Sequence, residues 1–263
     1  MDSTFDFVFH KSELDKIYWR FTSNDNRYQI KENENSIFPN SAIGLLKIEY
    51  CNEIVSYRTG ILIGENVILT AGHNLHDNRK NPKEPTLILG EPTKIEFYPG
   101  LNRNKSKFNV CNKIKAFYYP SDFKKKPNED YGIIILSENI GKETGYFNLQ
   151  IFDETIINTQ EKFFITGYPL NKTENDNTTF IQYKAEGKIY NLDREKGIIT
   201  HNIKSSYGQN GSGFCYFDNE LNKYFVIGVH VASNAFNDDE FYSTMITKKR
   251  FTQIQKWINE SKL

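Results

Sequence analysis

The sequence has few of the residues that build covalent or metal-bound frameworks. Three cysteines, Cys51, Cys111 and Cys215, are spread over 263 residues, and none lies in a Cys-x-x-Cys pair. An odd number at such spacings argues against a disulfide framework and against a zinc site. We therefore expect three ordinary core or surface cysteines, no metal and no cofactor.

A long hydrophobic run and a net charge are also missing. No stretch approaches the ~18 apolar residues of a membrane span, and residues 1–6 lack the cationic lead and apolar core of a secretory leader. Lysine plus arginine equal aspartate plus glutamate at 33 each, so no overall field favours nucleic acid or an anionic membrane. We expect a soluble monomer without nucleic-acid or membrane partners, and the compartment stays open.

Bulky side chains are abundant instead, with 20 Phe and 16 Tyr. From Ser41 onward they fall in short runs separated by Gly, Asn, Asp and Pro, which predicts an all-β sandwich or barrel. The runs at 61–63 and 67–69 flank a turn at 64–66 that begins with glycine, which predicts a hairpin. Further strands are expected at 42–50, 86–89, 110–119, 132–136, 162–167, 180–190, 198–203, 213–217 and 224–232.

The two ends of the chain depart from this pattern. Residues 1–40 are polar and irregular. Near the other end, Phe251, Ile254 and Ile258 recur at helical spacing with Trp257 beside them. One C-terminal helix is therefore predicted, with this face packed against the barrels.

A histidine follows one of the predicted strands. His73 comes after the apolar run at 67–69 and a small-residue turn, which places it at the edge of a cleft rather than inside a core. His76 and Asp77 follow closely, so a metal site of these three residues is an alternative, although further ligands at a recognised spacing are missing. A lone histidine is more often structural than catalytic. A catalytic role for His73 is favoured only when the next segment is considered with it.

An aspartate stands just before the apolar run at 132–136. Asp130 is drawn towards the interior there, and a buried carboxylate needs a hydrogen-bonding partner because its desolvation is costly. An imidazole N–H is such a partner, so we expect Asp130 to contact His73. An ordinary aspartate at the start of a strand is the competing interpretation.

A glycine-dense loop precedes the strand expected at 213–217. It contains Gly208, Gly211 and Gly213, and glycine permits a positive φ and lets backbone N–H groups converge on an anion. A phosphate-binding loop is the rival interpretation. No Lys-Ser/Thr pair follows the glycines and no helix is signalled, so this rival is disfavoured.

Taken in order, these three segments resemble the glutamyl endopeptidases, a group of chymotrypsin-type serine proteases. The resemblance spans roughly residues 25–260 and includes the stretches at 26–30, 165–169, 186–189 and 201–212. It implies two six-stranded antiparallel β-barrels with a C-terminal α-helix, and family members are typically secreted. The implied parts are an N-terminal extension packed on the barrels (1–40), a first barrel with His73 and Asp130 (41–140), and a second barrel with the 208–213 loop and the helix (141–263).

In that family a serine attacks the scissile carbonyl, histidine takes its proton, and aspartate orients the imidazolium. The resemblance gives the last two roles to His73 and Asp130. It places Asn210 at the nucleophile position, because residues 201–212 match the family's strand and loop without a gap; Ser212 is the less favoured register. The backbone N–H groups of Gly208 and Asn210 would form the oxyanion hole.

Substrate binding is also implied by the resemblance. His230 and Ser205 match residues that line the primary specificity pocket, which implies cleavage after glutamate or aspartate, although a buried strand histidine satisfied by backbone is the alternative for His230. Residues 231–233 replace glycines that follow the pocket histidine, which would narrow the cleft.

Asn210 is the more serious departure, because a carboxamide cannot replace an alkoxide. A form with serine at 210 is expected to cleave a peptide or protein in the inter-barrel cleft, and this chain to be inactive or nearly so. A natural pseudoprotease that binds peptides or proteins, or serves as a structural module, is the alternative.

Overall fold

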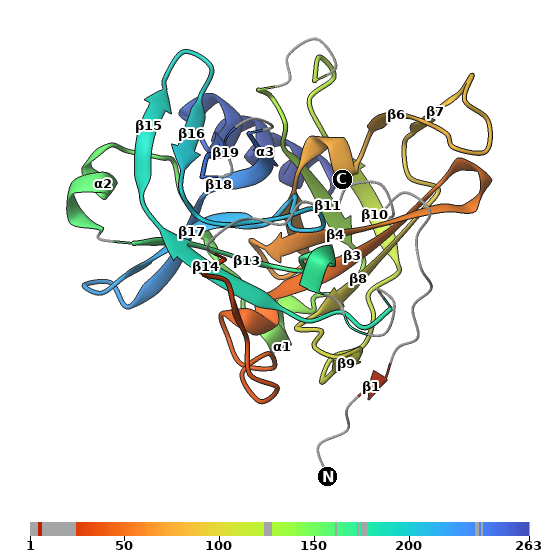
Figure 1. The fold of residues 1–263 in the computed structure, drawn as a ribbon, viewed down its shortest axis with the longest axis horizontal. Helices are drawn as coiled ribbons and strands as arrows, with labels where there is room; N and C mark the ends of the chain where they lie inside the picture. Colours follow the sequence, from red (N-terminus) through yellow and green to blue (C-terminus); the bar gives the residue numbers. More distant parts are fainter. Residues whose placement is uncertain are drawn as a thin grey trace.

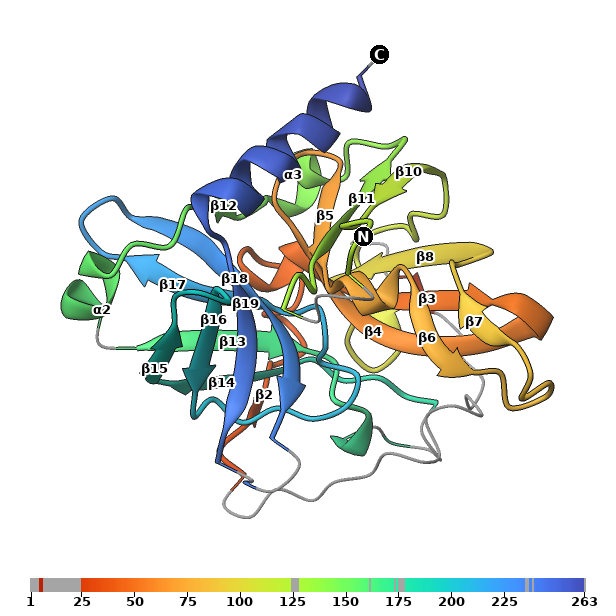
Figure 2. The same cartoon turned by 90° about the horizontal axis from the view of Figure 1, so that it is seen from above.

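Two curled β-sheets, formed one after the other along the chain, lie side by side with a helix across one side (Figures 1 and 2). In this computed structural model the described residues are 5–6, 25–123, 128–160, 162–172, 174, 178–234, 237 and 239–262.

The first sheet has six strands in the order β10-β11-β5-β4-β3-β8. Phe97 in β8 and Cys111, just before β10, exchange two backbone hydrogen bonds of 2.9 Å, and this contact brings the two edges of the sheet together as a barrel. The turn at 64–66 joins β4 and β5, as the sequence predicts. The strands are β3 (Ile43–Tyr50), β4 (Ile54–Leu62), β5 (Val67–Thr70), β8 (Lys94–Pro99), β10 (Ile114–Tyr118) and β11 (Gly132–Leu136).

The second sheet contains nine strands, of which β2 and β12 are two-residue additions at its margins. Only Lys188 separates β14 from β15, while β14 pairs with β13 and β15 pairs with β16. These two segments act as one bent strand, which closes the sheet into a six-stranded barrel. The strands are β2 (Tyr28–Gln29), β12 (Asn148–Leu149), β13 (Phe163–Gly167), β14 (Tyr183–Gly187), β15 (Ile189–Asp193), β16 (Ile198–His201), β17 (Gly213–Asp218), β18 (Lys223–Ser233) and β19 (Phe241–Met245).

Short elements fill the connections between these strands. Two further two-stranded sheets pair β1 with β9 and β6 with β7. The remaining elements are β1 (Phe5–Asp6), β6 (Asp77–Lys80), β7 (Ile88–Gly90), β9 (Lys105–Ser106), α1 (Gly141–Thr144), α2 (Thr155–Thr159), α3 (Lys248–Glu260), and the 3₁₀ turns η2 (Asn40–Ala42), η3 (Cys51–Glu53), η4 (Gly72–Asn74) and η5 (Leu170–Lys172).

The predicted all-β, two-barrel fold with a C-terminal helix is confirmed. Among the strands that form the two barrels, the predictions miss β8 and β19; the short strands β2, β6, β9 and β12 are missed as well. β8 is obscured by charge, because Glu96 lies within it between Lys94 and Lys47, each at 3.0 Å. β19 follows a polar stretch and has two hydroxyl residues among its five. The division into three segments stays a prediction, and residues 1–4 and 7–24 of the expected N-terminal extension lie outside the described residues.

The cysteines behave as small core or surface residues. All three lie in described parts of the chain, and none is bonded to another. Burial raises the pKa of the Cys111 thiol to about 12, which keeps it protonated and unreactive. Among the described residues, no helix has the length and apolar character needed to cross a membrane.

Helix α3 follows the second barrel in sequence but packs on the first. Thr247 caps its start by accepting a hydrogen bond from the N–H of Arg250. The Trp257 ring lies 6.0 Å from the ring of Tyr118 and 5.7 Å from that of Tyr131, both in the first-barrel part of the chain. The apolar face predicted from the sequence is therefore what joins the C-terminus to the far barrel.

Arg250 on this helix is a buried cation shared by both barrels. Its side chain is 3% exposed, and its Nε donates to the carboxylate of Glu129 at 3.2 Å. A buried guanidinium is tolerated only when its N–H groups are paired. Its Nη1 and Nη2 atoms donate to four backbone carbonyls, those of Asn128, Lys196, Gly197 and Met245, at 2.7 to 3.0 Å.

Replacing Arg250 by methionine should lower the free energy of unfolding by about 3–5 kcal/mol, because it leaves Glu129 buried without its partner. Urea unfolding would measure the change. Lys249→Met is the matched control: Lys249 is 77% exposed and only 3.7 Å from the same carboxylate, so we expect a change below about 0.5 kcal/mol. Equal effects of the two substitutions would contradict the prediction.

Candidate active site

The pairing of two strands brings His73 and Asp130 together. β5 ends where β11 begins, with Thr70 opposite Gly132, and His73 lies in η4 just beyond this point. The backbone N–H of His73 donates to Asp130 Oδ1 at 2.9 Å, and His73 Nδ1 lies 2.7 Å from Asp130 Oδ2. The carboxylate therefore fixes both the backbone and the ring of the histidine.

Asn210 reaches the other side of the same imidazole. It lies in the loop between β16 and β17, and its Nδ2 is 3.1 Å from His73 Nε2. In the tautomer that carries its proton on Nδ1, directed at Asp130, Nε2 is an acceptor to which the Asn210 amide can donate. Asp130, His73 and Asn210 thus form one hydrogen-bonded row across the junction of the barrels.

Two residues of the first barrel hold the loop that carries Asn210. Thr59 in β4 donates its backbone N–H to the Asn210 carbonyl at 3.2 Å and its hydroxyl to the Gly208 carbonyl at 2.9 Å. Asn74, fully buried, donates to the Asn210 carbonyl at 3.1 Å. Neither residue is predicted from the sequence. Asn74 beside His73 is a signal that could have been used, whereas nothing marks Thr59.

The backbone of this loop leaves two N–H groups available. Gly208 and Gly211 have φ of 95° and 94°, a region that favours glycine. Among the described residues, the N–H groups of Gly208 and Asn210 have no hydrogen-bond acceptor. Two unpaired backbone donors in one glycine-containing loop form a potential anion-binding site.

Ser212 lies on a different side of the loop. It is fully buried, and a methyl group placed on Gly167 in β13 would overlap its hydroxyl. Its backbone N–H donates to Gln209 and its carbonyl accepts from His230. The imidazole Nε2 of His73 is meanwhile contacted by Asn210.

His230 and Ser205, expected to line a pocket, contact each other. The Ser205 hydroxyl lies 2.8 Å from His230 Nε2, and both residues are buried. Burial lowers the pKa of His230 to about 3, so its ring is neutral near pH 7. A second buried histidine, His201, lies 5.8 Å away between ring centres and contacts the Ser243 hydroxyl at 3.0 Å. His230 is followed by Val231, which is nearly buried, and then by exposed residues at the end of β18.

Lys204 is a further cation beside this pair that the sequence analysis did not single out. Its side chain is 7% exposed and forms an ion pair with Asp239, which is 74% exposed. Its Nζ lies 6.0 Å from the centre of the Phe241 ring, which is itself 6.4 Å from the His230 ring. A lysine directly before Ser205 in a buried stretch is the signal that could have found it.

The residues of the alternative metal site have other partners. His76 Nδ1 lies 3.2 Å from the hydroxyl of Tyr119. Asp77 accepts several hydrogen bonds from Arg79, and despite burial these contacts hold the pKa of the Asp77 carboxyl below its usual range. Within the described ranges, no three His, Cys, Asp or Glu side chains converge on one point.

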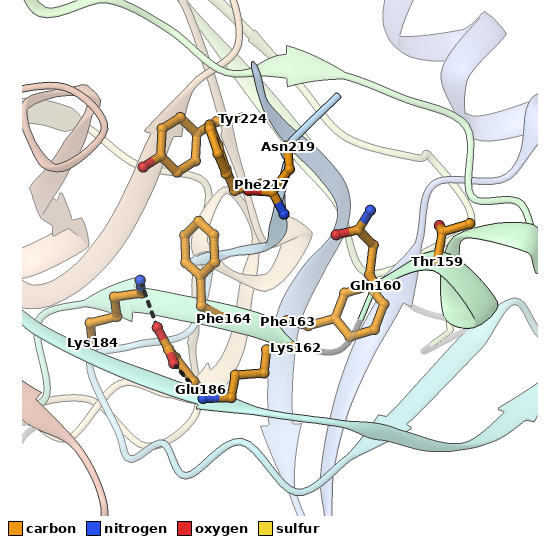
Figure 3. Close-up of a pocket in the computed structure, with 10 residues that line it drawn as sticks. All are labelled: Thr159, Gln160, Lys162, Phe163, Phe164, Lys184, Glu186, Phe217, Asn219 and Tyr224. Atoms are coloured by element: carbon orange, nitrogen blue, oxygen red, sulfur yellow. Dashed lines mark ion pairs between the residues drawn. The ribbon is translucent and has the colours of Figure 1, made fainter. Parts of the chain in front are cut away.

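A separate hollow of about 490 Å³ lies on the second barrel (Figure 3). Phe164, Phe217 and Tyr224 gather on one side of it, and Glu186 lies between two lysines on another. None of the residues around His73 lines it. The chemistry at the barrel junction therefore does not involve this hollow.

Two six-stranded barrels with a carboxylate–imidazole pair and a glycine-containing loop at their junction define the chymotrypsin-like class. The chain belongs to the trypsin family, whose model, described as Trypsin, matches residues 51–258. The glutamyl endopeptidase of Bacillus licheniformis is 27% identical over 207 residues, which make up 77% of this chain and 60% of that relative. The chain thus matches about 60% of the relative's length.

Solved structures agree on the fold. A structure described as Glu endopeptidase in complex with MPD has a TM-score of 0.70 at 23% identity, covering 90% of this chain and 98% of that one. The protease Anisep from Arthrobacter nicotinovorans has a TM-score of 0.63 at 11% identity, covering 87% and 96%. These likenesses extend over both barrels, beyond the residues that the family model matches.

Because His201 and His230 are buried, we expect the free energy of unfolding to fall in acid. Burial depresses the pKa of His201 and His230 in the folded protein, while unfolded histidine titrates near about 6.5. The unfolded state therefore binds protons first, so the free energy of unfolding falls as the pH drops below about 6.5 and continues to fall towards pH 3. Between pH 7 and 5, His230 should cost about 2 kcal/mol because its folded pKa is about 3, and His201 should add to the loss.

Urea unfolding at both pH values would measure this for the wild-type chain and for His201→Gln. The variant should lose less free energy of unfolding than the wild type over the same interval, because one titrating group is gone. An identical pH dependence would show that His201 does not contribute.

Proposed function

We propose that this trypsin-family scaffold is a serine endopeptidase whose nucleophile position holds Asn210. With serine there it would hydrolyse peptide bonds after glutamate or aspartate. As it stands the chain is inactive or nearly so. The observation that carries the proposal is the hydrogen-bonded row, with Asp130 2.7 Å from one ring nitrogen of His73 and Asn210 3.1 Å from the other.

A serine at 210 would complete a known sequence of proton transfers. As its hydroxyl oxygen attacks the scissile carbonyl, His73 Nε2 takes the hydroxyl proton and Asp130 stabilises the imidazolium. The carbonyl oxygen gains the negative charge, and the free N–H groups of Gly208 and residue 210 are the donors proposed to hold it. Collapse expels the amine with the proton from His73, and water then hydrolyses the acyl-enzyme by the same steps.

The amide of Asn210 cannot perform the first step. Its nitrogen lone pair is delocalised, so it is a poor nucleophile, and imidazole does not deprotonate it. Loss of the nucleophile from a triad lowers turnover by about 10⁶-fold, which corresponds to ~8 kcal/mol of barrier. The remaining donors leave a residual acceleration of roughly 10³–10⁴ over water.

Preference for an acidic residue is supported by the groups around Ser205. Because His230 is neutral near pH 7, the Ser205–His230 pair offers hydrogen bonds without positive charge. Lys204, adjacent in sequence, supplies the cation, and its partner Asp239 lies on the surface. A substrate carboxylate would bind the hydroxyl–imidazole pair and share the ammonium with Asp239.

Peptide binding without hydrolysis is the second candidate function. It is favoured by the contact between the Asn210 amide and His73, which satisfies the imidazole without disturbing its bonds to Asp130. Pull-down from the native source tests it. A monomer that retains no stoichiometric partner would count against it.

Asn210→Ser should raise turnover of a fluorogenic peptide carrying Glu or Asp at the cleavage position by about 10⁶-fold. A Lys peptide should remain uncut. Asn210→Ala, which removes the amide without supplying a nucleophile, is the matched control and should stay as inactive as the wild type. Ser212→Ala in the serine background should retain activity, because its hydroxyl is buried beneath the loop.

Activity confined to the serine variant and to acidic peptides would establish a protease disabled at one side chain. If the serine variant is folded, its N-terminal processing is controlled and it cleaves no peptide, the endopeptidase proposal is rejected and the binding role remains. Activity lost with Ser212→Ala would move the nucleophile to that residue.

The acidic preference has its own test in the serine background. Lys204→Gln should lower kcat/KM for a Glu peptide by roughly 10–100-fold, as expected for loss of a hydrogen bond to a charged group, and should leave a matched Gln peptide nearly unchanged. Asp239→Asn should act in the opposite direction, because it removes the carboxylate that competes for Lys204. An equal loss on both peptides would mean that Lys204 only supports the fold.

A further inference from the structure

We propose that Arg27 is a positioning residue for the loop at 205–210, holding it in the conformation that aligns the N–H groups of Gly208 and Asn210. The role of these donors as an oxyanion site rests on the proposed function. The contacts of Arg27 with the loop do not, and they can be tested separately.

Arg27 lies beneath the loop as a fully enclosed cation. Its side chain is 0% exposed, although the next residue, Tyr28 in strand β2, is exposed. Its Nη1 lies 2.7 Å from the Ser206 hydroxyl, 3.1 Å from Gln209 Oε1 and 3.1 Å from Asn171 Oδ1. One nitrogen thus faces three oxygen acceptors, two of them in the loop.

Gln209 transmits this contact to the backbone. Its Oε1 also accepts the Ser206 N–H at 3.0 Å, and its own N–H donates to the Ser206 carbonyl at 3.0 Å. Gln209 is fully buried and lies between Gly208 and Asn210. The peptide group that follows Gln209 carries the Asn210 N–H, so fixing Gln209 restrains that donor directly. The hydrogen bond from Gln209 N–H to the Ser206 carbonyl closes a turn around Tyr207 and Gly208, and so restrains the Gly208 N–H as well.

The Nε and Nη2 atoms of Arg27, on the side away from the loop, are held by Asp25. Asp25 accepts from Arg27 Nε at 2.8 Å and from Nη2 at 2.9 Å, in the two-pronged geometry that sets the plane of a guanidinium. Lys172 lies 2.8 Å from the same carboxylate. Although burial acts in the opposite direction, these hydrogen bonds hold the pKa of Asp25 well below its usual range, so the carboxylate stays charged.

The charge of Arg27 matters to the loop for a physical reason. Hydrogen bonds from a cation are roughly twice as strong as neutral ones, and an enclosed cation cannot leave its acceptors for water. Movement of Ser206 or Gln209 would remove a hydrogen-bond acceptor of this enclosed cation. The loop is thereby held in one conformation by a group of this chain's own N-terminal segment.

The first experiment uses the chain with Asn210 in place and needs no activity. Arg27→Gln should raise the amide hydrogen-exchange rates of Gln209 and its neighbours by about tenfold or more, while exchange in the first barrel stays unchanged. Lys31→Gln is the matched control: it removes a positive charge from the same segment, but Lys31 is 78% exposed and its ion pair, at 3.6 Å, is with Glu34 rather than with the loop. Unchanged loop exchange in a folded Arg27→Gln protein would overturn the proposal.

The second experiment uses the Asn210→Ser background. Arg27→Gln should lower kcat by about 10- to 100-fold with KM within about twofold, since the proposed donors act on the transition state. Arg27→Lys should recover part of kcat, and added methylguanidinium should recover part in Arg27→Ala. Equal losses in kcat for Arg27→Gln and Lys31→Gln, or a change in KM alone, would reject the positioning role.

The two experiments separate the proposals. If the serine variant cuts nothing but Arg27→Gln loosens the loop, the endopeptidase proposal fails and the anchoring of the loop stands. If the serine variant is active and Arg27→Gln only lowers thermal stability, with loop exchange and kcat unchanged, Arg27 anchors the N-terminal segment and the inference fails. Where Arg27→Gln does not fold, Arg27→Lys carries both readouts.

Discussion

The relative placement of the two barrels and the helix depends on the contacts that the buried guanidinium of Arg250 makes. It lies on α3, ion-pairs with Glu129 in the first barrel and donates to carbonyls around Gly197 and Met245 in the second. Its first-barrel partners come immediately before Asp130. The position of the carboxylate that orients His73 is thus tied to the same cation that joins the barrels, because an enclosed charge tolerates little displacement of its acceptors.

A second enclosed cation, Arg27, performs the corresponding task on the other side of the junction. With Arg250 behind the aspartate and Arg27 beneath the loop, the hydrogen-bonded row is held at both ends. The chain carries no net charge, so these effects are local. Paired charges of this kind add little to stability compared with apolar packing, but they define geometry, since each orphaned partner would be costly.

Against this rigid frame, the chemistry depends on the side chain at position 210. The amide of Asn210 makes the contact with His73 that a donor at this position should make, so the frame by itself does not reveal the reactivity of the side chain at 210. A scaffold can keep its histidine, its aspartate and its anion-binding loop while the step that forms a covalent bond is removed. This separation between geometry and reactivity is why hydrolysis and peptide binding are both compatible with the same arrangement of residues at the barrel junction.

Local signals in the sequence determined the strands, the helix face around Trp257, and the segments that carry His73, Asp130 and Asn210, because apolar periodicity and glycine placement act over short distances. The barrel strands β8 and β19 were not predicted by these signals. Only the tertiary structure decided that Thr59, Asn74 and Arg27 meet the loop at 205–210, since these contacts join residues about 130 to 180 positions apart. No pattern of neighbours encodes such a meeting. It follows from how two closed barrels pack against each other.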